Sequence, residues 1–201
     1  MILYNRRFSD FVTQEKDIIM NKRRIFSTIR QEIPNDFSLK ILEIGCDKGN
    51  FVKALAKEYP STKGIDINEY AISKGNCSKM YVMDAVNTNF KSSSFDIVYS
   101  SHVIEHISDG EGLFREISRI LSDEGKVIMV YPFEPIRGLM SLRIAWQTYH
   151  NPLMCRKLHV RLYTPSKIIR LIRKLDLKHV NSRLFFANTP QWITILRKRR
   201  D

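Results

Sequence analysis

An apolar run that contains an acid and then breaks into a glycine-bearing turn constrains this chain more than any other feature. Residues 41–44 are Ile-Leu-Glu-Ile, and a turn follows between Gly45 and Gly49. Apolar residues return with helical spacing from Phe51 to Leu55. The pattern predicts a buried strand, a loop and a helix. Because glycines let the backbone approach a ligand and a helix start offers N–H groups, the stretch indicates a nucleotide-like ligand.

The loop alone does not identify that ligand. Asp47 stands where the dinucleotide-binding fingerprint has its middle glycine, and no third glycine follows Gly49 at the required spacing. A Gly-Lys-Ser/Thr sequence is also missing, which argues against a phosphate-binding loop. Two glycines in a strand-to-helix turn occur in many α/β proteins whose loops bind nothing, so an empty loop stays open at this point.

Two later acids follow short predicted strands. Residues 63–68 indicate a strand that ends near Asp66, which in a doubly wound sheet could accept both hydroxyls of a ribose. Residues 80–85 indicate a third strand, which ends near Asp84. Two further strands are predicted over residues 94–101 and 125–132, the last of them stopped by a proline.

Helical patterns separate these strands. The clearest covers residues 112–121, and Ser108 with Glu111 has the spacing of a capping box at its start. An amphipathic stretch over residues 10–33 predicts one or two helices before the first strand, and another helix is expected to start near Thr164. Strands that alternate with helices imply an α/β fold with a parallel sheet and right-handed crossovers.

With these elements in place, the sequence resembles the class I S-adenosylmethionine-dependent methyltransferases, in the branch that modifies small molecules, lipids or glycans. The resemblance is strong over residues 39–133 and includes the loop motif at 41–51. Residues 102–106, His-Val-Ile-Glu-His, match that branch's Val-x-Glu-His signature. The resemblance implies a doubly wound, mostly parallel seven-stranded sheet, Rossmann-like, with an antiparallel last strand. It also implies S-adenosylmethionine as cofactor and S-adenosylhomocysteine as product.

The family's cofactor site carries over position by position. Asp66 would hold the ribose, Ile67 would lie beside the adenine, and Asp84 would cap the adenine amino group. The full set of cofactor-binding residues that the resemblance implies is Glu43, Gly45, Cys46, Asp47, Gly49, Asp66, Ile67, Asp84, Ala85 and Ser101. Asp47 departs from the family's usual glycine, which restricts the loop backbone and adds a negative charge near the cofactor.

The reaction would be an in-line transfer of a methyl group from a sulfonium to a nucleophile, which requires positioning and exclusion of water. Some acceptors also need a base. His106 and His102 follow the fourth strand and are the candidate catalytic residues, because histidine titrates near neutrality. His150 and His159 are further candidates in a later segment. No residues have the spacing of metal ligands, so no metal is expected.

A dinucleotide oxidoreductase is the nearest rival interpretation. The missing third glycine argues against it, and so does Asp84, which suits an adenine amino group better than a nicotinamide. The methyltransferase sheet should also end in an antiparallel hairpin. Residues 178–187 and 192–197, joined across 188–191, carry the β-branched and aromatic residues that such a hairpin needs.

Charge is distributed unevenly along the chain. Residues 1–133 hold equal numbers of basic and acidic side chains, so the whole formal net charge of +12 lies in residues 134–201. A basic region attracts anions such as nucleic acid, acidic lipid headgroups and phosphorylated or carboxylated substrates. The alternative interpretation is a set of solvated helix faces without a specific ligand.

Residues 134–163 form an insertion between the fifth strand and the next helix. Its apolar helical face comprises Leu139, Leu142, Ala145, Trp146 and Tyr149. Such a segment resembles a lid over the substrate, or a helix that lies on a membrane surface near a lipid-linked substrate. A helix packed onto its own domain is the alternative.

The length of 201 residues suits a single domain with four parts. They are N-terminal helices at 1–38, a cofactor-binding core at 39–133, the insertion or lid at 134–163, and a helix with a C-terminal hairpin at 164–201. Three cysteines without metal spacing favour a reducing compartment, so a cytoplasmic location is expected. No apolar run has the length of a membrane span, and no signal peptide is visible.

The expected partner is a small-molecule, glycan or lipid acceptor of acidic character, given the basic half of the chain. Peripheral membrane contact through the basic insertion is a further expectation. Ser-Ser-His follows the fourth strand, in place of the Asp/Asn-Pro-Pro-Tyr of amino-methylating nucleic-acid enzymes, so nucleic acid is a weaker expectation. RNA methylation and cofactor binding without catalysis stay open as alternatives, as does the oligomeric state.

Overall fold

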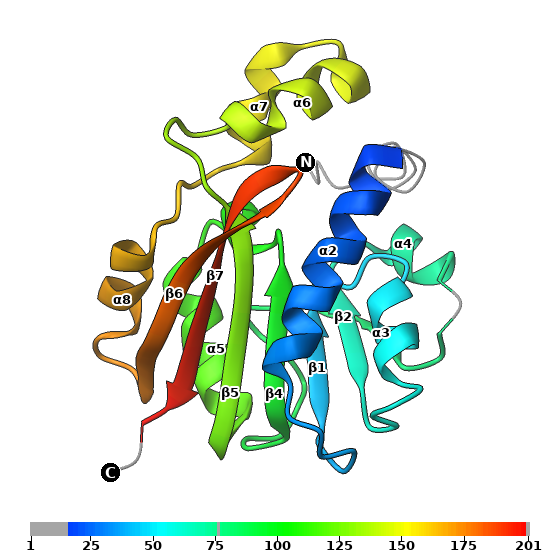
Figure 1. The fold of residues 1–201 in the computed structure, drawn as a ribbon, viewed down its shortest axis with the longest axis vertical. Helices are drawn as coiled ribbons and strands as arrows, with labels where there is room; N and C mark the ends of the chain where they lie inside the picture. The colour runs from blue at the N-terminus through cyan, green and yellow to red at the C-terminus, as the bar shows by residue number, and fades with distance from the viewer. Residues whose placement is uncertain (1–15, 76, 200–201) are drawn as a thin grey trace.

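The computed structural model describes residues 16–75 and 77–199 (Figure 1). Seven strands form one sheet in the order β3-β2-β1-β4-β5-β7-β6. The strands are β1 (Ile41–Ile44), β2 (Lys63–Asp66), β3 (Met80–Val82), β4 (Phe95–Ser101), β5 (Leu121–Pro132), β6 (Leu177–Ala187) and β7 (Thr189–Lys198). β1 to β5 pair in parallel, and β7 runs antiparallel to both β5 and β6. The predicted doubly wound sheet with an antiparallel last strand is therefore confirmed.

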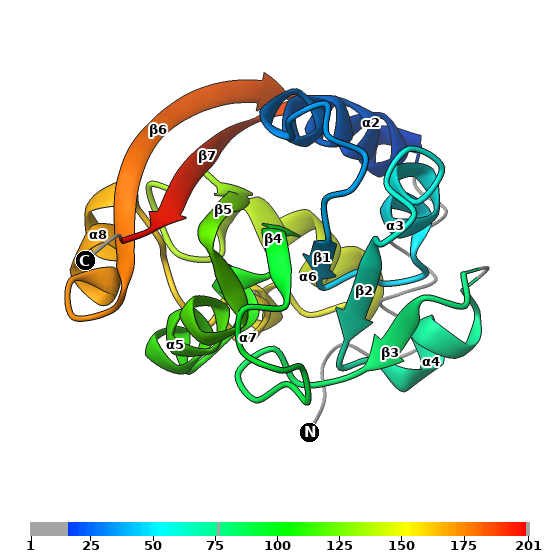
Figure 2. The same ribbon diagram turned by 90° about the horizontal axis from the view of Figure 1, so that it is seen from below.

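Helices cover both faces of this sheet. The α-helices of the described residues are α2 (Lys16–Glu32), α3 (Asn50–Leu55), α4 (Glu69–Ser73), α5 (Gly110–Ile120), α6 (Leu142–Tyr149), α7 (Cys155–Leu158) and α8 (Pro165–Ile172). Short 3-10 helices are η1 (Ile104–His106), η2 (Leu139–Ser141) and η3 (Pro152–Met154). Figure 2 shows α2 and α3 on one side of the sheet and α5 on the other. Strands buried on both faces explain the near-continuous apolar runs of the sequence.

Successive residues of β1 point to opposite faces of the sheet and pack into two separate hydrophobic clusters. Leu42 and Ile44 are buried in a cluster with residues of α5 and α8. Ile41 is buried in a second cluster with Ile25 and Ile29 of α2. The predicted amphipathic helix before the first strand is confirmed from Lys16 onward, whereas residues 10–15 of that prediction lie outside the described residues. No helix within residues 16–75 and 77–199 is long and apolar enough to cross a membrane.

The structure corrects the predicted start of α5. Asp109, not Ser108, is the N-cap residue, and its Oδ1 accepts a hydrogen bond of 2.8 Å from the backbone N–H of Gly112. Glu111 lies in the first turn and pairs with Arg115 at 3.0 Å, so it does not complete a capping box. Asp and Ser cap helices about equally well, so the neighbouring Asp109 can take the position that the spacing assigned to Ser108.

Two boundaries at the far side of the sheet also differ from the predictions. β5 begins at Leu121 rather than at 125, because Leu121 pairs with Phe95 ahead of a register irregularity. β7 begins at Thr189 rather than at 192, because the hairpin turns at Asn188 alone. Asn188 has φ 73°, a conformation that asparagine tolerates better than most residues. Pro190 therefore lies within a strand, close to its start, where its missing N–H is tolerated.

The insertion stands beyond the carboxyl ends of the parallel strands, where Figure 1 shows α6 and α7. Its predicted apolar face is only partly buried. Ala145 is fully buried, whereas Trp146 is 58% exposed and Leu142 is 39% exposed. Thr148 and Ser141 take the buried positions instead. The helix start near Thr164 is confirmed, since the Thr164 side chain accepts a hydrogen bond from the N–H of Lys167.

Candidate functional site

A cavity of about 1140 Å³ lies at the carboxyl ends of β1, β2, β4 and β5, between the sheet and the insertion. Its wall contains every predicted cofactor-binding residue except Gly49, and both predicted catalytic histidines. Pockets for one small ligand are usually about 300–1,000 Å³. The cavity is therefore large enough for a cofactor and an acceptor together.

Two glycines shape the loop after β1. Gly45 has φ 76°, and a Cβ at this position would collide with the side chain of Val103. Its N–H donates to the carbonyl of Ile65 at 2.8 Å, which ties the loop to β2. Gly49 has φ 73°, is the N-cap of α3 and packs against Met80. Gly49 thus faces Met80 and not the cavity, which explains why it does not line the cavity.

Asp47 occupies the position where glycine was expected, and its backbone adopts the conformation that glycine favours. Its φ is 49°. The Asp47 N–H donates a hydrogen bond to Oδ2 of Asp66 at 2.8 Å. Its carboxylate pairs with the ammonium of Lys22 in α2, 3.7 Å away, so the added negative charge has a compensating cation. Lys22 also lines the cavity, and sequence reasoning missed it.

Asp66 is held in place by two backbone N–H groups. Oδ2 accepts from Asp47, and Oδ1 accepts from Asn68 at 2.8 Å. Burial raises the pKa of Asp66, and these hydrogen bonds work in the opposite direction. Each carboxylate oxygen keeps a second lone pair. The geometry fits a carboxylate that accepts the two hydroxyls of a ribose.

The segment that follows β3 forms another part of the cavity wall. Asp84 accepts a hydrogen bond from the N–H of Val86 at 3.0 Å, and both residues line the cavity with Ala85. Ile67 also lines it and is 51% exposed, which is unusual for an isoleucine beside a buried strand. An apolar surface next to a fixed carboxylate suits an adenine ring with an amino group.

Glu43 lies beneath the glycine loop and is 4% exposed. Burial raises its pKa to about 8, although the hydroxyl of Tyr99 and the ammonium of Lys22 lower it. Its Oε2 has no hydrogen-bond partner within the described part of the chain. Burial also raises the pKa of the Cys46 thiol, which keeps that cysteine protonated and unreactive.

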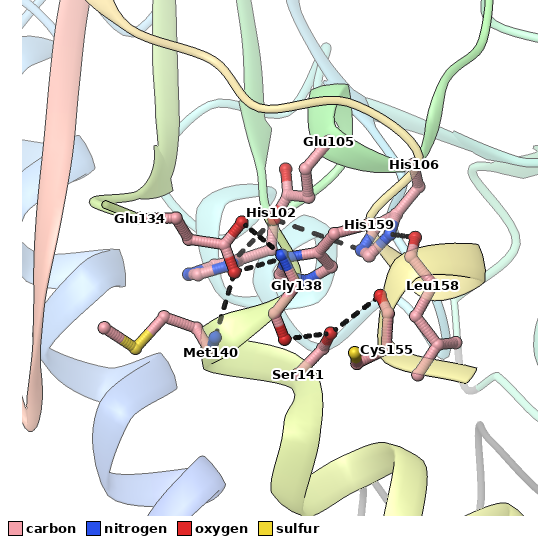
Figure 3. Close-up of polar contacts among 10 residues, drawn as sticks. All are labelled: His102, Glu105, His106, Glu134, Gly138, Met140, Ser141, Cys155, Leu158 and His159. Atoms are coloured by element: carbon pink, nitrogen blue, oxygen red, sulfur yellow. Dashed lines mark hydrogen bonds and ion pairs between the residues drawn. The ribbon is translucent and has the colours of Figure 1, made fainter. Parts of the chain in front are cut away.

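At the acceptor end, five side chains form what we call the histidine cluster: His102, Glu105, His106, Glu134 and His159. Figure 3 shows how they converge from the end of β4, from η1 and from the insertion. His102 Nδ1 donates to Glu105 Oε1 at 3.1 Å, and His106 Nε2 lies 4.0 Å from the same oxygen. His159 Nδ1 donates to Glu134 Oε1 at 2.8 Å. His106 Nδ1 lies 2.6 Å from the carbonyl oxygen of Leu158.

The charges within the histidine cluster follow from burial and from these contacts. Burial alone would raise the pKa of Glu105, but the hydrogen bond from His102 and the neighbouring histidines hold it at about 2. Burial lowers the pKa of His106. Burial also acts against charge on His159, but its hydrogen bond to Glu134 raises its pKa overall.

The structure separates the four histidines that the sequence offered. His102, His106 and His159 line the cavity, whereas His150 is an exposed residue that ends α6 and does not. Sequence reasoning did not identify Glu134 as a site residue. Nothing in the sequence shows that the insertion folds back and brings His159 beside it. Backbone N–H groups of Gly138 and Met140 also donate to Glu134, at 3.2 and 3.0 Å.

The comparison with known families decides between the methyltransferase and the oxidoreductase interpretations of the sequence. A family model described as "Methyltransferase domain" matches residues 14–182. The chain belongs to this methyltransferase family. The predicted class I S-adenosylmethionine-dependent methyltransferase is thereby confirmed at the level of family and fold, with S-adenosylmethionine as its cofactor. The oxidoreductase interpretation is set aside.

Known methyltransferases resemble the chain over part of their length. Ajmaline N-methyltransferase from Rauvolfia serpentina is 32% identical over 113 residues, which cover 49% of this chain and 39% of that protein. Phosphoethanolamine N-methyltransferase 1 from Arabidopsis thaliana is 28% identical over 146 residues, 62% of this chain and 30% of that protein. This methyltransferase thus spans well under half the length of either curated relative.

A solved structure gives the same fold over nearly the whole chain. Magnesium protoporphyrin IX methyltransferase from Synechocystis, determined with bound S-adenosylhomocysteine, superposes with a TM-score of 0.68 and 15% identity. The match covers 92% of this chain and 86% of the other. At that identity the likeness concerns the fold, and the cofactor-binding and catalytic residues of this methyltransferase stay predictions.

Proposed function

We propose that this methyltransferase transfers the methyl group of S-adenosylmethionine to an anionic small-molecule, lipid or glycan acceptor. The observation that carries the proposal is one cavity with two chemically different ends. Asp66 and Asp84 line one end, and Arg143 and Lys157 of the insertion line the other. Carboxylates suit the hydroxyl and amino donors of the nucleoside, and cations suit an anionic acceptor.

In this proposal the cofactor end holds S-adenosylmethionine through groups that the fold has already oriented. Asp66 would accept the ribose hydroxyls, Asp84 the adenine amino group, and the Gly45 turn would lie along the methionine part. Ile67 would cover the adenine ring. When bound, S-adenosylmethionine supplies a methyl group already activated by its sulfonium. The remaining task of the chain is to align an acceptor with that carbon and to exclude water.

The acceptor end is formed mainly by the insertion. Arg143 and Lys157 would attract and orient an anionic group, while α6 and α7 separate the cavity from solvent on that side. His106, with His159, would contact the acceptor, whereas His102 donates to Glu105 and is better described as a positioning residue. Relatives named for phosphoethanolamine and ajmaline support a small acceptor, since both names describe small molecules.

The test is transfer of a methyl label. The purified chain is incubated with methyl-labelled S-adenosylmethionine and with separate lipid, glycan, small-molecule and RNA fractions of a cell extract. We expect label in an anionic lipid, glycan or small-molecule fraction, and none with Asp66→Ala. Label that enters only RNA would overturn the acceptor class. Cofactor binding without transfer to any fraction would favour a binding protein without catalysis.

A further inference from the structure

We propose that Glu105, His106 and His159 form a binding site for one divalent transition-metal ion such as Zn²⁺. The three residues each offer one ligand atom, and these atoms all lie within 4.8 Å of one another. Glu105 and His106 belong to η1, and His159 follows α7 in the insertion. Because the ligands come from distant segments, their spacing in the sequence does not reveal such a site, and the sequence alone predicted no metal.

The ligand set matches a known preference. Two imidazole nitrogens and one carboxylate oxygen, with a further position open, are typical of catalytic Zn²⁺ sites and of other divalent transition metals. An ion about 2.0–2.2 Å from each ligand would bring the ligand atoms to about 3–3.5 Å from one another. The Nε2–Oε1 separation between His106 and Glu105 is 4.0 Å, and all three ligand atoms lie within 4.8 Å of one another, so small rotations of the side chains would bring them to this range.

Contacts behind the ligands orient both histidines. His106 Nδ1 lies 2.6 Å from the carbonyl oxygen of Leu158, and a carbonyl can only accept, so Nδ1 carries the proton. His159 Nδ1 donates in the same way to Glu134 at 2.8 Å. In each ring Nε2 is then the nitrogen that can ligate. Metal-binding histidines almost always bond through their other nitrogen to a carbonyl or carboxylate in this manner.

Glu105 supplies the negative charge of the site. Its side chain is 2% exposed, and its Oε1 accepts from His102. Its Oε2 is buried without a hydrogen-bond partner, as far as the described residues extend. A buried carboxylate oxygen without a partner is costly unless a cation compensates it. A metal ion bound to this carboxylate would compensate its negative charge.

The site would have two consequences. His106 and His159 line the cavity, so an open coordination position would face the acceptor end and could hold an oxygen of an anionic acceptor. This role rests on the proposed function, whereas metal binding itself does not. Because His159 belongs to the insertion and the other two ligands to the core, the ion would also fasten the insertion over the cavity.

The experiment uses the full chain after removal of metal with a chelator. Zn²⁺ is titrated calorimetrically, and Co²⁺ is added in parallel to follow its visible absorption bands, which report the coordination geometry. We expect one ion per chain for the unchanged protein. Glu105→Gln, which keeps the size of the side chain, and His159→Ala should each weaken Zn²⁺ binding more than about 100-fold, and Glu134→Gln about 10–100-fold.

His150→Ala is the matched control, because it removes an exposed histidine of the same insertion. It should leave Zn²⁺ binding unchanged, and circular dichroism checks that each variant is folded. No saturable Zn²⁺ binding, or equal binding by all variants, would overturn the proposal. A separate titration with S-adenosylmethionine keeps the two proposals apart: metal binding without cofactor binding contradicts only the proposed function, and cofactor binding without metal binding contradicts only the metal site.

Discussion

The backbone N–H of Asp47 donates a 2.8 Å hydrogen bond to Oδ2 of Asp66. This contact joins the loop after β1 to the acid at the end of β2, so the two predicted parts of the cofactor site form one unit. The donor belongs to the backbone, and the φ of 49° at Asp47 aims it correctly. The departure from glycine at residue 47 is therefore compatible with the site.

The conformation of Asp47 leads to a first prediction. Asp47→Val places a β-branched side chain in a left-handed conformation and should lower the free energy of unfolding by about 1–3 kcal/mol. Asp47→Asn keeps a residue type that tolerates this conformation and should change stability little. Urea denaturation of both variants measures the difference. Equal stability of the two variants would show that the loop does not hold this backbone angle.

A second prediction concerns the contact between Gly45 and Val103. Gly45→Ala should destabilise the protein for two reasons: the left-handed backbone costs about 1–2 kcal/mol for a residue with a Cβ, and the new Cβ meets Val103. In the Val103→Ala background only the first cost should remain. Denaturation of the two single variants and the double variant forms a double-mutant cycle. Strict additivity in that cycle would contradict the predicted collision.

The raised pKa of Glu43 predicts how stability depends on pH. Glu43 titrates at about 8 in the folded chain, against 4.5 for an unperturbed glutamate. Between these values the folded state holds a proton that the unfolded state has released. The contribution of Glu43 to stability is therefore fully present below pH 4.5 and is lost as the pH rises through 8.

Glu43→Gln separates this effect from the other titrating groups. The variant resembles protonated Glu43, so it should match the unchanged protein below pH 4.5 and become more stable than it as the pH rises toward 9. Denaturant unfolding at several pH values follows the difference between the two proteins. A difference that does not vary with pH would show that Glu43 ionises normally.

The elements that the sequence predicted well are those fixed by local pattern. The strand at 41–44, the loop that follows and the acids Asp66 and Asp84 lie within short segments whose apolar residues and glycines specify them. The N-cap of α5 was placed one residue too early, at Ser108, because the capping-box spacing does not exclude the neighbouring Asp109. The pairing of Glu134 with His159 was not predictable, because it depends on how the insertion folds back, and local patterns carry no information on that.

The basic wall of the insertion leads to a prediction about the acceptor. Arg143→Ala and Lys157→Ala should each raise the KM for an anionic acceptor by about 10–100-fold, since a hydrogen bond to a charged group contributes about 1.5–3 kcal/mol. The affinity for S-adenosylmethionine should not follow that change. Arg170→Ala, an exposed arginine of α8 outside the cavity wall, is the control. Unchanged acceptor kinetics in both cavity variants would contradict the assignment of the acceptor end.

Calorimetric titration of the purified chain with S-adenosylmethionine tests the central claim most directly. We expect saturable binding of one molecule per chain, weakened about 10–100-fold by Asp66→Ala through loss of charged hydrogen bonds to the ribose. Asp123→Ala, which removes an exposed carboxylate near the start of β5, should leave the affinity unchanged. An absence of binding heat, or equal affinity in Asp66→Ala and the unchanged protein, would contradict the account.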